Sequence, residues 1–149
     1  MTTRRTVLKA MSLGPAVLAS NVLPALAAPD PSRISLVIGN SAYRQAPLAN
    51  PANDASAMRD LLTSAGFSVE AHLDAKRADL LAAVDRFAAA AQQSSTRLAV
   101  FYYAGHGVQL DWRNYLLPVD IEVNGAEDVK RQCIDLGRLL GRLAQIRDK

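Results

Sequence analysis

The chain has 149 residues, 50% of them hydrophobic, which suits one globular domain and is too short for two domains of ordinary size. It holds 17 basic and 14 acidic residues; without Arg4, Arg5 and Lys9 of the N-terminal segment, 14 basic residues balance the 14 acidic ones. Because the body is balanced and has no run of Lys or Arg interleaved with aromatic residues, we exclude nucleic-acid binding.

Residues 1–27 have the organisation of an export signal. The paired Arg4-Arg5 precede a mostly apolar stretch, Ala10 to Leu23, and Ala25-Leu26-Ala27 then provides a small-x-small cleavage site. The arginine pair and its surroundings resemble the bacterial twin-arginine signal. We therefore expect cleavage after Ala27 and a periplasmic or secreted mature protein; the alternative is an amphipathic helix that belongs to the fold.

The apolar part of this leader does not predict a membrane span. Pro15, Asn21 and Pro24 interrupt it before it reaches the roughly 20 apolar residues that a span needs. We expect no membrane attachment once the leader has been removed.

The residues that follow begin with a strand pattern and then a helix pattern. A short apolar run, residues 34–38, stops at Gly39-Asn40 and predicts a buried parallel strand. After a loop, either Asn53 or Asp54 can cap a helix whose apolar residues recur at helical spacing, and Gly66 suits its C-terminal end.

Two further strands and a second helix come next. Residues 67–73 predict a strand, and the segment 78–91, rich in Ala and Leu, predicts a helix. Residues 97–103 form the strongest strand pattern in the chain, so we expect this strand to be central. It leads directly into Gly105-His106-Gly107.

The remaining pattern completes the predicted fold. Residues 108–110 and 115–117 predict a small hairpin, with 111–114 between its strands, and residues 134–146 predict a closing helix. Strands that alternate with helices indicate a three-layer α/β/α domain over residues 28–149, with a mostly parallel sheet and right-handed crossovers. Since such a pattern continues with another central strand, we expect the sheet to be incomplete at the C-terminus.

His106 is the candidate catalytic residue. In open α/β sheets the functional crevice lies beyond the carboxyl ends of the strands, which is where Gly39-Asn40 and Gly105-His106-Gly107 are predicted to lie. An imidazole that titrates near neutral pH suits proton transfer, and flanking glycines let a substrate backbone approach. The alternative interpretation is a surface or core histidine without a catalytic role.

Four segments of the chain resemble, in their order and spacing, the large catalytic subunit of the bacterial caspase and metacaspase-like cysteine peptidases. They are residues 36–43 (LVIGNSAY), 48–55 (LANPANDA), 101–109 (FYYAGHGVQ) and 114–120 (NYLLPVD). The resemblance extends from about Arg33 to the end of the chain. It implies a caspase-like fold and hydrolysis of peptide bonds in protein or peptide substrates.

The resemblance also implies roles for individual residues. His106 matches the catalytic histidine, which activates a cysteine thiol, and the amide of Gly107 matches a donor of the oxyanion hole. Asp54 matches an acidic residue that lines the pocket for a basic P1 side chain in metacaspases. Ala104 stands where these relatives often carry serine, so one polar contact of that pocket would be missing. A helix N-cap is an equally open role for Asp54.

The nucleophile that the resemblance implies has no counterpart here. In the family it follows the next strand in a pattern such as Asp-x-Cys, whereas the single cysteine of this chain, Cys133, follows no predicted strand. We expect Cys133 to be a partly buried residue at the start of the closing helix. A lone cysteine also excludes an internal disulfide.

Three hypotheses therefore stand. The chain is a truncated cysteine endopeptidase, which we favour; or it is a natural noncatalytic caspase-like module that binds a partner; or it is another hydrolase that pairs His106 with Asp111 or Asp120. No residue spacing predicts a metal or another cofactor: calcium dependence occurs among relatives, but no calcium-loop pattern is present here. The sequence predicts no oligomeric state.

Overall fold

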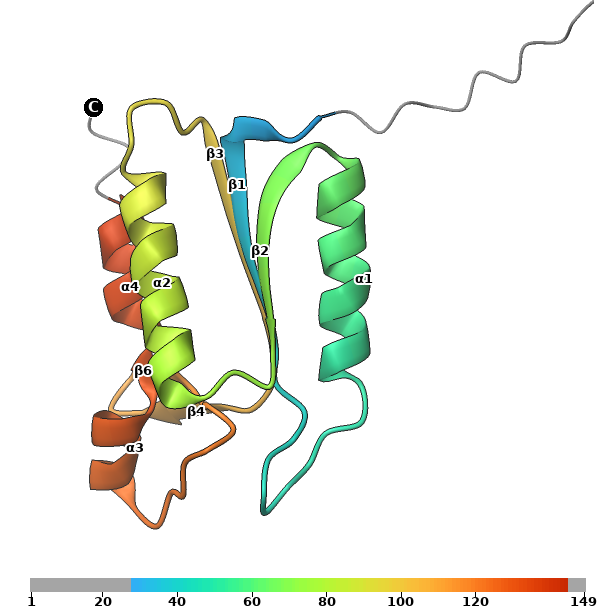
Figure 1. The fold of residues 1–149 in the computed structure, drawn as a ribbon. Coiled ribbons are helices and arrows are strands. Elements are labelled where there is room, and N and C mark those ends of the chain that lie inside the picture. Colours follow the sequence, from blue (N-terminus) through green and yellow to red (C-terminus); the bar gives the residue numbers. More distant parts are fainter. Residues whose placement is uncertain (1–27, 145–149) are drawn as a thin grey trace, which may run out of the picture.

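A computed structural model describes residues 28–144, which form three layers, α/β/α (Figure 1). The middle layer is a parallel sheet in the order β2-β1-β3, so β1 is its central strand. Its strands are β1 (Asp30–Gly39), β2 (Phe67–Leu73) and β3 (Leu98–Ala104). The predicted α/β class with a parallel sheet is confirmed.

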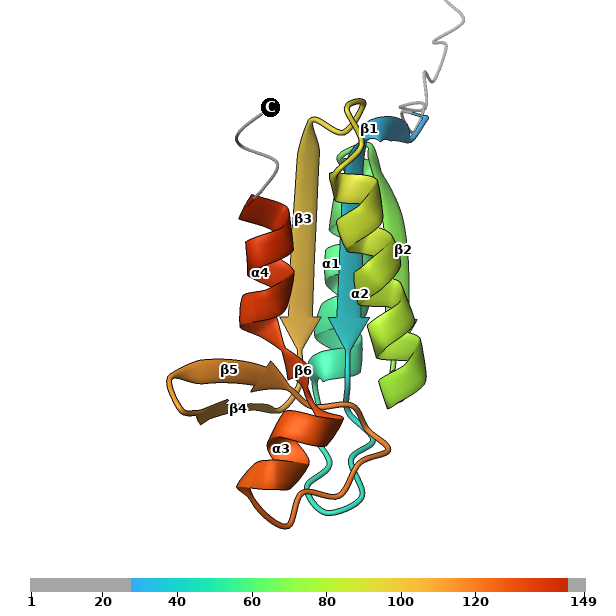
Figure 2. The same cartoon turned by 90° about the vertical axis from the view of Figure 1, so that its left-hand side faces the viewer.

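Helices cover both faces of this sheet. Helix α1 (Pro51–Ser64) packs on one face, while α2 (Arg77–Ala91) and α4 (Leu136–Ala144) lie side by side on the other (Figure 1, Figure 2). The three strands run in the same direction, so their carboxyl ends meet at one end of the molecule (Figure 2). The chain segments after these strands are therefore brought together.

A second, small sheet lies at that same end. It is antiparallel in the order β4-β5-β6, and a short helix, α3, precedes β6 (Figure 2). Its elements are β4 (Gly107–Leu110), β5 (Arg113–Leu116), α3 (Ala126–Gln132) and β6 (Ile134–Asp135).

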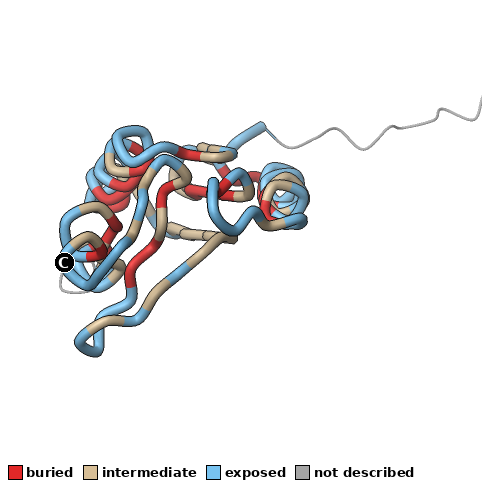
Figure 3. The backbone as a smooth tube through the Cα atoms, turned by 90° about the horizontal axis from the view of Figure 1, so that it is seen from below, coloured by how far each residue is buried: buried red, intermediate tan, exposed pale blue. Residues whose placement is uncertain are grey.

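The alternation of side chains along β1 builds a core on each side of the sheet. Leu36 and Ile38 are fully buried among the apolar residues of α2, and Val37 is fully buried against Ala55 and Leu62 of α1. Burial of such a side chain contributes about 1.5–3 kcal/mol to folding. Figure 3 shows the result, with the helices exposed on their outer sides and buried toward the sheet.

Several expectations about these elements are wrong in detail. The strand of residues 98–104 is an edge strand of the described sheet and not its centre, because it pairs with β1 alone. Helix α1 begins at Pro51 with Asn50 as its N-cap residue, so neither Asn53 nor Asp54 caps it. Proline is well suited to the first helical position because its missing N–H is not needed there.

The C-terminal elements also differ from the prediction. The hairpin turn contains only Asp111 and Trp112, both with positive φ, so β5 begins earlier than expected. Helix α3 was not predicted, and the closing helix starts at Leu136 because Ile134 and Asp135 pair with β5.

Some expectations fall outside the described residues. The predicted leader, residues 1–27, lies outside them, as do residues 145–149 at the end of the predicted domain. Within residues 28–144, no helix is both long and apolar enough to span a bilayer.

Candidate active site

The structure places His106 at the crevice end of the parallel sheet. Gly39, the last residue of β1, pairs with Ala104, the last residue of β3, and His106 follows two residues later. A cavity of about 120 Å³ adjoins the histidine. Its walls come from the loop after β1 and from the segment after β5: Tyr43, Arg44, Gln45, Ala46, His106, Leu117, Pro118, Ile121 and Val123.

The imidazole ring of His106 is held by two contacts. Its Nε2 atom is 2.7 Å from the carbonyl oxygen of Ala46, and the ring packs on Tyr43 with 4.4 Å between ring centroids. Because a carbonyl oxygen can only accept a hydrogen bond, Nε2 carries the hydrogen. In the neutral ring Nδ1 then holds the lone pair, and it is the nitrogen that can accept a proton from a thiol.

Two tyrosine hydroxyls hold the backbone of His106. The His106 N–H donates to Oη of Tyr43 (2.9 Å), and Oη of Tyr103 donates to the His106 carbonyl oxygen (2.9 Å). The two hydroxyls are 3.1 Å apart, and both lie within 3.0 Å of the carbonyl oxygen of Leu117. The histidine is therefore fixed at both its ring and its main chain.

Burial keeps both phenols protonated, so they remain available as donors. It raises the pKa of Tyr43 and, together with the hydrogen bond to Tyr43, that of Tyr103. Gly105 makes room for the pair: a Cβ atom there would lie 2.6 Å from the hydroxyl oxygen of Tyr43 and 2.8 Å from that of Tyr103. A side chain at residue 105 would push the two hydroxyls off the histidine.

Asn40 joins the loops that surround the site. Its fully buried side chain donates from Nδ2 to the carbonyl oxygen of Leu117 (3.0 Å) and accepts the Ala75 N–H at Oδ1 (2.9 Å). Its own N–H donates to the carbonyl oxygen of Ala104 (2.8 Å). One side chain thus connects the segments that follow β1, β2 and β5.

Asp74 orients the start of the loop that carries Tyr43. Its Oδ1 atom accepts hydrogen bonds from the amides of Ser41 (2.7 Å) and Ala42 (2.8 Å). Asp74 has φ +51°, a conformation that aspartate adopts more readily than most residues. The carboxylate therefore fixes the direction in which the chain leaves β1.

The amide of Gly107 points away from the small sheet. The Leu117 N–H donates to the carbonyl oxygen of His106 (3.1 Å), so these two residues form a hydrogen-bonded pair. In an antiparallel ladder the next pair, Gly107 with Leu116, is of the non-hydrogen-bonded type, in which the N–H groups face outward. The exposed Gly107 can therefore direct its N–H toward a ligand.

The other two predicted site residues occupy different places. Ala104 is half-buried at the end of β3, directly before Gly105. Asp54 is exposed in the first turn of α1 and does not line the cavity beside His106. Ala104, His106 and Gly107 thus lie together at the end of β3, and Asp54 lies outside the lining of the cavity beside His106.

The two carboxylates that could have partnered His106 have other contacts. Asp111 lies 3.1 Å from Nζ of Lys130, and Oδ1 of Asp120 accepts the N–H of Arg77 (2.7 Å). Neither contacts His106 among the described residues. Asp120 is close to the first residue of α2, so its contact stabilises the start of that helix.

Cys133 lies apart from this site. It is 7% exposed and packs with Tyr115 and Val129, between the end of α3 and the start of β6. The expected position at the start of the closing helix is therefore wrong, since β6 intervenes. Burial raises the pKa of its thiol to about 11, so it is a neutral thiol at physiological pH.

We expect the Cys133 thiol to react slowly in the folded protein. At pH 8, iodoacetamide should alkylate it at least ~10-fold more slowly in the native chain than in urea, because only the thiolate is the nucleophile. The raised pKa also means that the folded state favours the neutral thiol over the thiolate. The stability that the neutral thiol contributes is therefore fully present below pH 9 and is lost as the pH rises toward about 11. Equal alkylation rates in both states would contradict the buried position.

The site thus defines a class of protein: a three-layer α/β domain that presents an oriented histidine and an outward glycine amide beyond a parallel sheet. Within residues 28–144, no group of three or more His, Cys, Asp or Glu side chains is arranged to hold a metal ion.

Comparisons with known proteins agree with this class. The sequence profile of the caspase domain, Peptidase C14, matches residues 32–146. The chain is 34% identical over 89 residues to the human mucosa-associated lymphoid tissue lymphoma translocation protein 1. The aligned segment covers 59% of this chain and 11% of that protein. The chain therefore spans about a tenth of that curated relative. It belongs to the caspase-domain family of cysteine peptidases.

Proposed function

We propose that this chain is the histidine-bearing part of a cysteine endopeptidase domain. The observation that carries the proposal is the hydrogen bond from Nε2 of His106 to the Ala46 carbonyl oxygen, which leaves Nδ1 as the basic nitrogen. In the proposed reaction Nδ1 removes the proton of a cysteine thiol, and the thiolate attacks the peptide carbonyl carbon. The imidazolium then gives that proton to the leaving amine.

Gly107 supports the same reaction from the adjacent position. Its outward N–H would donate to the oxygen of the tetrahedral intermediate, and a donor of this kind contributes about 3–4 kcal/mol to transition-state stabilisation. Since a side chain is absent at residue 107, a substrate main chain can come close to that amide.

The nucleophile in this proposal comes from a segment that the 149 residues do not contain. Cys133 is the single cysteine of the sequence, and it is buried, protonated and absent from the lining of the His106 cavity. The histidine therefore needs a second cysteine, supplied by further sequence of the gene product or by another chain.

The test is to express the gene with the coding DNA that follows codon 149 and to assay the purified product on fluorogenic peptides with Arg, Lys or Asp at P1. We expect hydrolysis, and alkylation of a cysteine other than Cys133 by a peptidyl acyloxymethyl ketone. Preference for Arg or Lys would support a role for Asp54 in the P1 pocket. A folded product that neither hydrolyses peptides nor reacts with the inhibitor would contradict the proposal.

The second candidate is a noncatalytic module that uses the same crevice to bind a partner peptide. The lack of a usable thiol in the chain favours it. The gene product would then bind the uncleaved peptides and show no alkylation at a second cysteine, which separates the two candidates in one experiment.

We also propose that residues 1–27 direct export through the twin-arginine route. This rests on the arginine pair, the apolar stretch and the cleavage site of the sequence, and it would place the domain in the periplasm or outside the cell.

A further inference from the structure

A second cavity, larger than the one at His106, measures about 650 Å³. It is lined by residues of α2, α3, α4, β5 and β6 and of the β4-β5 turn; Figure 2 labels these elements. It shares no lining residue with the cavity beside His106. We call it the basic groove because Arg and Lys side chains dominate its lining.

Positive charge dominates the lining of the basic groove. Six basic side chains face three acidic ones, although the body of the chain as a whole is balanced. The basic residues come from four different elements, so the fold gathers them from distant parts of the sequence: Arg77, Arg113, Lys130, Arg131, Arg138 and Arg142.

Each of the three acidic residues is already matched by a basic residue of the same lining. These pairs cancel three of the six positive charges. They are Asp85 with Arg142 (2.5 Å), Asp111 with Lys130 (3.1 Å) and Asp135 with Arg113 (2.8 Å).

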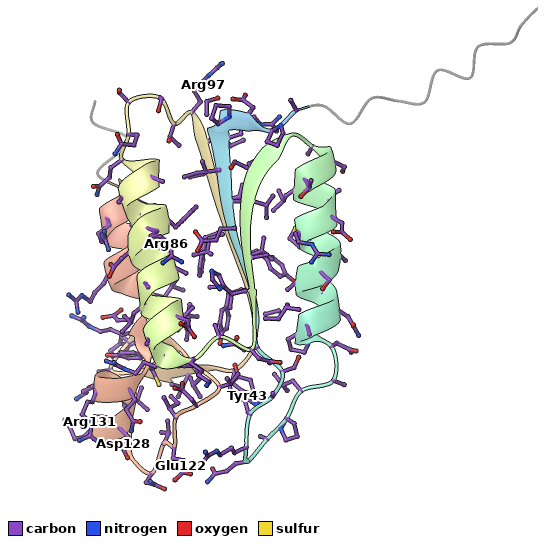
Figure 4. All side chains as sticks on the ribbon, viewed as in Figure 1. Tyr43, Arg86, Arg97, Glu122, Asp128 and Arg131 are labelled. Atoms are coloured by element: carbon purple, nitrogen blue, oxygen red, sulfur yellow. The ribbon has the colours of Figure 1, made fainter. Side chains whose placement is uncertain are left out.

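Of the other three basic residues, Arg131 pairs with a carboxylate outside the lining, so the excess of positive charge comes from Arg77 and Arg138. Arg77 donates to the backbone carbonyl oxygens of Arg131 and Gln132, which are neutral partners. Arg131 and Asp128 lie side by side on α3 (Figure 4) and form an ion pair of 2.6 Å. The side chain of Arg131 is 75% exposed. Within residues 28–144, no carboxylate lies within ion-pair distance of the guanidinium group of Arg77 or of Arg138; the Asp120 carboxylate contacts Arg77 only at its main-chain N–H.

The floor of the basic groove is apolar. Leu81 of α2 lines it and is half-buried, so part of its side chain is open to the groove. Val84 of α2 and Ile134 of β6 also line it, but the core already covers them and they are only 6% and 5% exposed. A purely ionic ligand such as polyphosphate makes no use of this floor, whereas a peptide can place an apolar side chain on it.

We propose that the basic groove binds an acidic peptide segment of a partner protein. Its carboxylates would pair with Arg77, Arg131 and Arg138, and an apolar side chain between them would cover the open part of Leu81. The surface is separate from His106, so this interaction does not depend on the proposed catalytic chemistry. It would hold a partner or substrate at a second position on the domain.

The experiment uses the full chain and a short fluorescein-labelled peptide in which glutamates alternate with leucines. Anisotropy titrations compare the unchanged chain with a variant carrying Arg131→Glu and Arg138→Glu. We expect the variant to bind at least ~10-fold more weakly, and binding to weaken as salt is raised. The matched control is Arg97→Glu with Arg86→Glu, which changes net charge equally; Arg97 lies at the opposite end of the molecule from Arg131 (Figure 4).

Two further peptides separate the proposal from general anion binding. Replacing glutamate by glutamine should abolish binding, and replacing leucine by serine should weaken it. Equal affinity of the groove variant and the control variant would overturn the proposal. The proposal would also be overturned if polyphosphate displaced the peptide and, in addition, the serine peptide bound as tightly as the leucine peptide. Circular dichroism melts of each variant confirm that it is folded.

Discussion

On the proposed function, the change His106→Ala should lower kcat/KM for peptide hydrolysis by on the order of 10³-fold in the product expressed with the coding DNA that follows codon 149, which is within the range that general acid–base catalysis contributes. In the proposed reaction the imidazole is both the base that creates the thiolate and the acid that protonates the leaving amine, so its loss removes both steps. Because His106 is only half-buried, the melting temperature should change little. Steady-state assays and thermal melts of the same preparations check this result.

The chain supplies a matched control in His72, its other histidine. His72 lies on β2, where Nε2 is 2.8 Å from a carboxylate oxygen of Glu70, and it does not line the cavity beside His106. The change His72→Ala should leave kcat/KM within about 2-fold of its original value, as for a residue without a transition-state role. A similar loss in both variants would instead indicate a general effect on folding.

The change Asn40→Ala should lower the free energy of unfolding by about 2–4 kcal/mol. It leaves the Ala75 N–H without its acceptor, and an unpaired buried group costs about 1–3 kcal/mol. The Leu117 carbonyl oxygen loses one donor but keeps the hydroxyls of Tyr43 and Tyr103. The cavity left behind adds to this loss. Urea denaturation followed by circular dichroism measures the difference.

Asn50→Ala is the control for this prediction. Asn50 is exposed at the N-cap of α1, and its side chain makes no capping hydrogen bond, so its removal should cost less than about 0.5 kcal/mol. Equal losses for the two asparagines would show that the buried hydrogen bonds of Asn40 do not stabilise the loops around the site.

Much of the fold follows from periodicity, and its errors have definite causes. Strand β2 and helix α2 lie where their patterns predict them, because each has a clear apolar period and a turn at its end. Helix α3 was missed because its sequence, AEDVKRQ, is polar and buries only Val129. The apolar sequence of β3 predicts a central strand, but apolar content does not show how many strands pair with it, and in the described sheet β3 pairs with β1 alone.

The candidate site was predictable only where side-chain chemistry marks it. His106 and Gly107 follow from the Gly-His-Gly pattern and the family resemblance. Tyr43 and Asn40 belong to the segments that resemble the family, yet nothing in the spacing shows that one would bind the histidine main chain and the other its supporting loops. The contact of Nε2 with residue 46 is made by a main-chain atom, which leaves no signature in a sequence.

The hydrogen bond between Nε2 of His106 and the Ala46 carbonyl oxygen depends on the path of the main chain and not on the side chain of residue 46. Since the acceptor is the main chain of an exposed alanine, almost any side chain could occupy position 46 without changing how the imidazole is protonated. The path of the peptide is what counts, and Pro47 restricts the residue before it to extended conformations. Because the ring of Pro47 also fixes its own φ, the 46–47 peptide plane cannot readily flip, so the acceptor stays in place and Nδ1 remains the basic nitrogen of His106.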